Sequence, residues 1–174
     1  RPDRPDDAPL MLDWLVLLAQ DQTGYDNLCA LVSQAHVDRP VADDAHVPFA
    51  ALAAHADGLI CLTGSGEGAL ARLIAEDQPQ AAEAWLDRLQ ALFGDRLYVE
   101  LSRTGDAVMD AAEAALIDLA YARGLPLVAT NPAAYAEPDF HAAHDVLLCI
   151  ASSSYLESQD RPRSGSESWM KPAD

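Results

Sequence analysis

The stretch Gly124-Leu-Pro-Leu-Val-Ala-Thr-Asn-Pro-Ala-Ala-Tyr135 decides the fold of this chain. Residues 127–129 form a short apolar run, which predicts a buried β-strand. A long amphipathic helix over 108–123 precedes it, and Thr-Asn-Pro at 130–132 leads out of it. Residues just past the carboxyl end of a parallel strand face the ligand site in sheets and barrels. Here they are Asn, Pro and Ala, with no acid, histidine or cysteine before Tyr135.

Three more apolar runs predict strands upstream of this one, and helical patterns separate all four. Because strands and helices alternate, we expect right-handed parallel units and an α/β fold with about four parallel strands. The first and last runs are apolar on both faces, which is typical of strands with a neighbour on either side. Residues 1–9, rich in Pro and Asp, predict a loop. The expected strands are 15–19, 59–62, 97–101 and 127–129, and the expected helices are 23–35, 48–54, 69–74, 79–93, 108–123 and 140–150.

Helix ends and buried faces follow from capping residues and apolar spacing. Thr23, with Asp26 three residues later, resembles a capping box, so we expect Thr23 to cap the first helix. Asp139 stands where it can cap the last helix. The faces expected to be buried are Tyr25, Leu28, Val32 and Ala35 on the first helix, Ala82, Trp85, Leu86, Leu89 and Phe93 on 79–93, and Met109, Ala112, Leu116 and Leu119 on 108–123.

The composition is that of one acidic folded domain. Half of the 174 residues are hydrophobic, which excludes disorder throughout, and the length favours a single core. The formal net charge is −17, so we expect no direct binding to nucleic acid, whose phosphates such a surface repels. No apolar run approaches the ~20 residues that span a bilayer, and we expect a cytoplasmic protein without membrane contact. Cys29, Cys61 and Cys149 lie in apolar runs, which predicts buried free thiols.

Two polar segments invite a functional interpretation that their residues do not support. Gly64-Ser-Gly-Glu-Gly68 lacks the GxGxxG spacing and carries an acid that would repel phosphate. We therefore interpret it as a strand-to-helix turn. Ser152-Ser-Ser154 has no histidine–acid pair nearby in sequence, so we do not expect a nucleophile there.

Three titratable residues are candidates for chemistry, each with a structural alternative. His141 and His144 are spaced for one helix face, as two zinc ligands would be. No third or fourth ligand is evident, so we expect them to cap or to pack. Glu100 lies inside a predicted strand near its carboxyl end, where a catalytic acid could stand. It could equally form an ion pair with Arg103 or another base.

Five segments of the chain, in order, carry a resemblance to a known family. They are Leu15-Val-Leu-Leu-Ala-Gln-Asp-Gln-Thr-Gly-Tyr-Asp-Asn-Leu28, Asp57-Gly-Leu-Ile-Cys-Leu-Thr-Gly-Ser65, Tyr98-Val-Glu-Leu-Ser-Arg-Thr-Gly105, Ala122-Arg-Gly-Leu-Pro-Leu-Val-Ala-Thr-Asn131 and His144-Asp-Val-Leu-Leu-Cys-Ile150. Together they resemble the PHP (polymerase and histidinol phosphatase) domain, in the version of the bacterial replicative DNA polymerase III alpha subunit. The match covers nearly the whole chain, which makes it specific. An unrelated small α/β binding module is the alternative if the order of motifs is coincidence.

The resemblance implies a distorted seven-stranded β/α barrel, of which this chain would hold the last four strands. The family's opening strands, with their paired histidines, have no counterpart here. Residues 1–151 would be the C-terminal part of a PHP-like domain, and residues 152–174 a linker toward polymerase domains. Without its neighbours the 15–19 strand would have an unpaired edge, which can pair with another chain. We therefore expect the chain either to self-associate along that edge or to depend on upstream sequence for a monomeric fold.

The resemblance also implies where metal ligands would lie, and this chain departs from the pattern at each position. Trp14 and Thr104 replace family histidines, and Pro132 and Ala134 replace the Asp and His that follow Thr-Asn in active members. Trp, Pro and Ala cannot coordinate a metal, and a lone Thr hydroxyl is a poor ligand. His144 matches a family histidine that we do not take to be a ligand. We therefore expect no catalytic, cofactor-binding or metal-binding residues in this chain.

Two functions follow from the resemblance, and the missing ligands favour the first. In the first, the chain is part of a replicative DNA polymerase (a nucleotidyltransferase) and forms a metal-free scaffold that stabilises the polymerase and docks a separate exonuclease subunit. In the second, it is a metal-dependent phosphoesterase acting as a 3′–5′ proofreading exonuclease. We expect no cofactor in this segment and magnesium only in the polymerase domain. The expected partners are the rest of the alpha chain and the exonuclease subunit.

Overall fold

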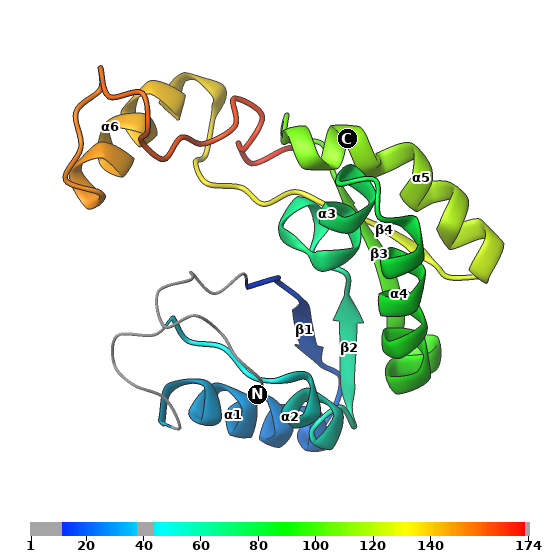
Figure 1. The fold of residues 1–174 in the computed structure, drawn as a ribbon. Helices are drawn as coiled ribbons and strands as arrows, with labels where there is room; N and C mark the ends of the chain where they lie inside the picture. Colours follow the sequence, from blue (N-terminus) through cyan, green and yellow to red (C-terminus); the bar gives the residue numbers. More distant parts are fainter. Residues whose placement is uncertain (1–11, 38–43, 173–174) are drawn as a thin grey trace, which may run out of the picture.

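The computed structural model describes residues 12–37 and 44–172, so the loop predicted for 1–9 lies outside the described residues. Its order of elements matches the alternation that the sequence predicts (Figure 1). In chain order the elements are β1 (Val16–Ala19), α1 (Gln22–Val37), α2 (Phe49–Ala54), β2 (Leu59–Leu62), η1 (Ser65–Glu67), α3 (Ala69–Ala75), α4 (Pro79–Phe93), η2 (Gly94–Arg96), β3 (Leu97–Ser102), α5 (Ala107–Arg123), β4 (Leu127–Thr130), η3 (Pro138–Phe140) and α6 (His141–Ala151), where η marks a 3-10 turn.

The four strands form one open sheet in the order β1-β2-β3-β4, and the α/β class is confirmed. β2, β3 and β4 are parallel, with Val99 opposite Leu127 and Cys61 opposite Leu97. The expectation of four parallel strands is wrong for β1, which runs antiparallel to β2 with Val16 opposite Leu62. The open sheet is in keeping with part of a barrel.

A close contact between two glycines explains the direction of β1. A Cβ on Gly24 would lie 1.9 Å from the carbonyl oxygen of Gly58, so the first turn of α1 rests on the turn that enters β2. Gln20 N also donates to Gly58 O over 2.8 Å. The end of β1 is thereby held beside the start of β2, and two strands arranged in this way are antiparallel. Gly58 has φ +70, a conformation that glycine adopts without a Cβ penalty.

The two outer strands are less buried than their apolar sequences predict. Val16 is 38% exposed and Leu18 is 48% exposed, and β4 is at best half-buried. Burial on both faces is therefore wrong for β1, because within the described residues its outer edge has no neighbour and α1 packs against it. The expected free edge of this strand is present.

The core lies between β2 and β3 and the layer of α3, α4 and α5, which Figure 1 shows beside these strands. Leu59, Cys61, Leu97 and Val99 point into it. The predicted faces of α4 and α5 are confirmed, with Trp85 and Leu119 partly buried against the core. Their fully buried members are Ala82, Leu86, Leu89, Phe93, Met109, Ala112 and Leu116.

Helix α1 differs from the prediction in its cap and its face. Asp21 accepts a hydrogen bond from Gly24 N (2.9 Å), so Asp21 caps the helix and Thr23 lies inside it. Tyr25 and Val32 are exposed, whereas Gly24 and Leu31 are buried. The contact of Gly24 with the turn before β2 fixes which side of the helix faces inward, and apolar spacing alone does not reveal that contact.

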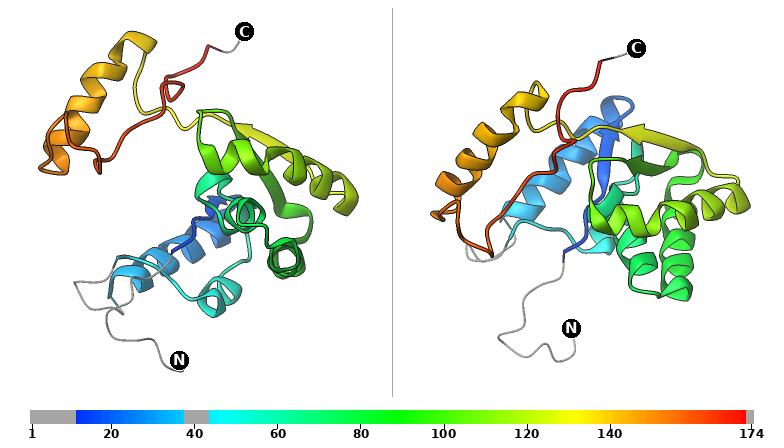
Figure 2. Two further views of the ribbon diagram at one scale, coloured as in Figure 1. Left: turned by 45° about the horizontal axis from the view of Figure 1, so that its top comes forward. Right: turned by 90° about the horizontal axis from the view of Figure 1, so that it is seen from above.

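Helix α6 stands apart from the sheet, as Figures 1 and 2 show. Among the described residues its main contacts with another element are those with η3. η3 precedes the helix, so Asp139 lies in that turn and no side chain caps α6, contrary to the prediction. Residues 161–171 then return along α6 to the segment that follows β4, where Tyr135 and Trp169 form an isolated β-bridge. We call residues 131–172 the arm.

Candidate functional site

The carboxyl ends of β2, β3 and β4 lie at one edge of the sheet because these strands are parallel. This is the edge at which open α/β sheets and barrels bind ligands. Hydroxyl side chains dominate there: Thr63 follows β2, Ser102 ends β3, and Thr130 ends β4. Thr63 and Ser102 are buried.

Glu100 is the buried acid at this edge, and its side chain joins the three strands. Only 6% of the residue is exposed. One carboxylate oxygen accepts a hydrogen bond from Gly64 N over 3.0 Å, and the other accepts one from the Thr130 hydroxyl over 2.7 Å. Its own backbone N donates to the Thr63 hydroxyl oxygen over 3.0 Å. Both oxygens are therefore used by neutral donors of the protein, as buried polar groups require.

Arg103 does not pair with Glu100. Its guanidinium donates to Glu113, in the second turn of α5, over 2.7 Å. The prediction of that ion pair is wrong, because Arg103 lies past the end of β3, where its side chain is exposed. The catalytic role considered for Glu100 stays a prediction.

The thiols are partly as expected. Cys61 and Cys149 are buried free cysteines, but Cys29 is exposed. Burial, and after it the charge of Glu100, raises the pKa of Cys61 to about 12. The Cys61 thiol is therefore protonated at neutral pH and is no nucleophile.

The glycine loop after β2 is a turn, as predicted. Gly64 has φ +87, and η1 then leads through Gly68 into α3. The amide of Gly64 is bound by the Glu100 carboxylate, so it is not available to a phosphate. A Cβ on Gly64 would lie 2.2 Å from Trp14 O, which brings the start of β1 to the same edge.

The positions that match family ligands lie near this edge, and the end of the chain covers some of them. Ala134 N donates to Ser168 O over 2.7 Å. A Cβ on Gly165 would lie 2.3 Å from Thr104 O, so the returning segment also touches the loop after β3. Trp14 is 65% exposed at the other side of the edge. The return of 165–169 over this edge was not predicted. Trp169 in a Ser-rich tail was its signal, since aromatic residues usually pack.

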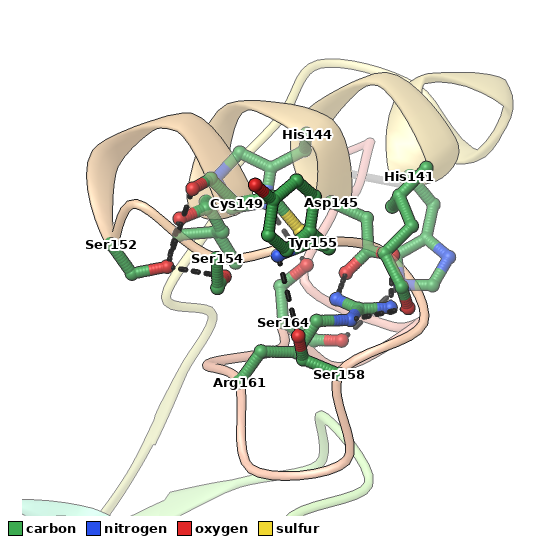
Figure 3. A network of polar contacts seen from close by, with 12 residues as sticks. His141, His144, Asp145, Cys149, Ser152, Ser154, Tyr155, Ser158, Arg161 and Ser164 are labelled. Carbon is green, nitrogen blue, oxygen red and sulfur yellow. Dashed lines mark hydrogen bonds and ion pairs between the residues drawn. The ribbon is translucent and has the colours of Figure 1, made fainter.

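His141 and His144 hold the arm together. Figure 3 shows both rings directed at Ser164: His141 Nε2 lies 3.2 Å from its carbonyl oxygen and His144 Nδ1 lies 3.0 Å from its hydroxyl. The Tyr135 ring packs against both imidazoles. The predicted packing role is confirmed. Ser152 bonds to Leu148 O and to Ser154, in the turn that ends α6.

The donor set of this edge does not fit a catalytic metal. Its buried acid, Glu100, accepts a hydrogen bond at each oxygen, and Asp106, in the loop after β3, caps α5 through Met109 N. The neighbouring groups are hydroxyls, an indole, a proline and a methyl group. Within residues 12–37 and 44–172, no three His, Cys, Asp or Glu side chains are grouped as ligands of one ion. None of the described helices is long and apolar enough to cross a membrane.

Comparisons with known proteins agree with the resemblance noted in the sequence. The profile of the PHP domain matches residues 9–104. The DNA polymerase III subunit alpha of Caulobacter vibrioides is 42% identical over 92% of this chain, and that of Rickettsia bellii is 35% identical over 91%. The Thermus aquaticus protein of the same name is 34% identical over 92%. The chain spans 14% of the first two relatives' length and 12% of the third.

Proposed function

This chain belongs to the PHP domain family, and we propose that it forms part of a replicative DNA polymerase III alpha subunit, as a scaffold without a catalytic metal. The polymerase assignment is supported by the relatives that carry this name over 91–92% of the chain. In this proposal the whole protein is a DNA-directed DNA polymerase that uses magnesium in domains outside this chain. The segment itself has no catalytic residues and no cofactor.

The hydrogen bonding of Glu100 is the observation that carries the scaffold proposal. A metal at the strand ends needs carboxylate or imidazole ligands with free lone pairs directed at the ion. Glu100 uses one lone pair of each oxygen for Gly64 N and the Thr130 hydroxyl, and these bonds orient the carboxylate and tie the exits of β2 and β4 to β3. A carboxylate directed at these two donors stabilises the sheet edge and is not directed at a substrate.

The segment that follows β4 supports the same proposal. Pro132 and Ala134 stand where active members have ligands, and Ala134 N is bonded to the returning arm. The backbone of the chain thus takes up space over the edge where a phosphoester would have to approach.

The proposed partners are the rest of the alpha chain and a separate exonuclease subunit. The outer edge of β1, which no described strand pairs, is a surface on which further parts of the polymerase can pack, and the exposed face of α6 is one on which a separate subunit can pack. In this proposal other domains contact the DNA. A segment with a net charge of −17 repels phosphates and has few bases that could displace the counterions of DNA.

Metal content and hydrolytic activity test the proposal together. We expect the chain, purified without chelator, to contain less than one equivalent of zinc or manganese and to hydrolyse neither p-nitrophenyl phosphate nor the 3′ end of single-stranded DNA. Two or more equivalents of metal, with activity lost in Glu100→Gln, would establish the phosphoesterase instead. Wild type and Glu100→Gln should be equally inactive.

A further inference from the structure

Helix α6 exposes an apolar face that no described part of the chain covers. Leu147 is 61% exposed, Ile150 is 71% exposed, and Tyr155, in the turn after the helix, is 79% exposed. Single exposed apolar residues are common, but several in one place mark an interaction site. Val146 and Leu156 are also exposed, and together with Ile150 and Tyr155 they line one groove, so these four form one patch on the arm.

A shallow groove of about 490 Å³ runs through this patch, between α6 and the turn of residues 153–157. One wall is formed by Val146, Cys149 and Ile150, and the other by Tyr155 and Leu156 together with the serines before them and Glu157. The volume lies within the range of sites that take a bulky side chain or a small ligand.

Arg161 holds the two walls of the groove in place. Its guanidinium donates to Asp145 of α6 over 2.7 Å and, through Nε, to Leu156 O of the turn over 3.0 Å (Figure 3). Ser154 N also donates to Cys149 O over 2.9 Å. Asp145 and Arg161 are not among the residues that line the groove, and the charge of Arg161 is balanced by Asp145.

The groove itself carries a negative charge. Among the residues that line it, Glu157 is charged and none is a Lys or Arg. Asp145, the acid of α6, is paired with Arg161 and is not counted here. A second copy of the chain would bring the same acid against Glu157, which costs free energy at close range. A partner that carries Lys or Arg around an apolar centre is complementary.

We propose that this groove binds a short segment of a partner protein, in which a bulky apolar side chain is flanked by lysine or arginine. The apolar side chain fills the space beside Ile150, and a flanking base faces Glu157. This inference rests on the proposed scaffold function, in which the chain binds a partner protein. It adds where on the chain that partner binds and which side chains it presents.

Selection from a random dodecapeptide library displayed on phage, with the full chain as bait, tests the proposal. We expect the enriched peptides to combine a Leu, Ile, Phe or Trp with Lys or Arg. Synthesised with a fluorescent label, they should bind wild type about tenfold more tightly than Ile150→Asp, which places a carboxylate in the groove. Their affinity should fall as salt rises, because exposed charges are screened.

Val32→Asp is the matched control, since Val32 is an equally apolar, 53% exposed residue on α1. It should bind the peptides as wild type does, and thermal melts should show both variants folded. Enrichment of acidic or uncharged peptides, peptides that Ile150→Asp does not weaken, or no enrichment would overturn the proposal. A dimer that Ile150→Asp dissociates would show that a second copy is the occupant. The scaffold function fails separately, by metal-dependent hydrolysis.

Discussion

The body of the molecule (residues 59–130) and the arm use similar polar residues to opposite effect. In the body, Glu100 and its hydroxyl neighbours join strands beneath an apolar cover formed by α3, α4 and α5. In the arm, Asp145, Arg161 and the two histidines join a helix to the returning chain, while the apolar residues of that helix face outward. A hydrogen bond stabilises most where it is buried with its partners, so the body should resist changes that loosen the arm.

The largest expected difference between the body and the arm is in the loss of stability when a side chain of similar size is shortened in each. Leu86 on α4 is fully buried, so Leu86→Ala should lower the free energy of unfolding by about 2–5 kcal/mol. Ile150→Ala in the arm should change it by less than about 0.5 kcal/mol. Urea titration followed by circular dichroism measures both. Equal losses would mean that the arm is packed as firmly as the body.

Glu100 tests the polar part of the body. Glu100→Ala leaves Gly64 N and the Thr130 hydroxyl without their acceptor, and we expect a loss of about 1–3 kcal/mol. Glu100→Gln keeps one oxygen in place and should lose less. The same urea titration compares the two variants. If the alanine variant is as stable as wild type, the carboxylate does not hold the strand ends together.

Acid should release the arm before it unfolds the body. The hydrogen bond from Arg161 holds the pKa of Asp145 below its usual value. Because the pKa of Asp145 is lower in the folded chain, the ion pair stabilises the arm fully at pH values above the unfolded pKa of an Asp, about 3.9. This stabilisation is lost as the pH falls through the lower pKa of the folded state. The amide NMR signals of Leu156 and Arg161 should therefore shift below about pH 4, while Leu86 signals keep their native positions. In Asp145→Asn the arm signals should lack this transition.

The free edge of β1 gives the smallest expected effect. We expect weak self-association of the chain at high protein concentration, and Leu18→Lys should abolish it, because a charge on an edge strand opposes pairing with another copy. Light scattering over a range of concentrations measures the change. Ile150→Lys, on the arm, should leave the association unchanged if β1 is the contact. A wild-type chain that is monomeric throughout would mean that four strands form a self-sufficient sheet.

The sequence predicts the elements of the body well because their signals are local. The apolar runs at 59–62 and 97–101, Pro79 at the start of α4 and the face of α5 all appear as expected. Helix α1 and strand β1 were predicted less well. Their direction and inward face depend on the contact of Gly24 with Gly58, which joins residues 34 positions apart and leaves no periodic signal.

The sequence by itself determined the family, the order of strands and helices and the acidic charge, because each is a property of residue types and their spacing. Tertiary structure decided how those residues are used. Because β2, β3 and β4 pair side by side, the Glu100 carboxylate of β3 accepts hydrogen bonds from the residues that follow β2 and end β4. The return of 165–169 to the loops after β3 and β4, and the ion pair of Arg161 with Asp145, bring together residues whose contact depends on the path of the chain in space.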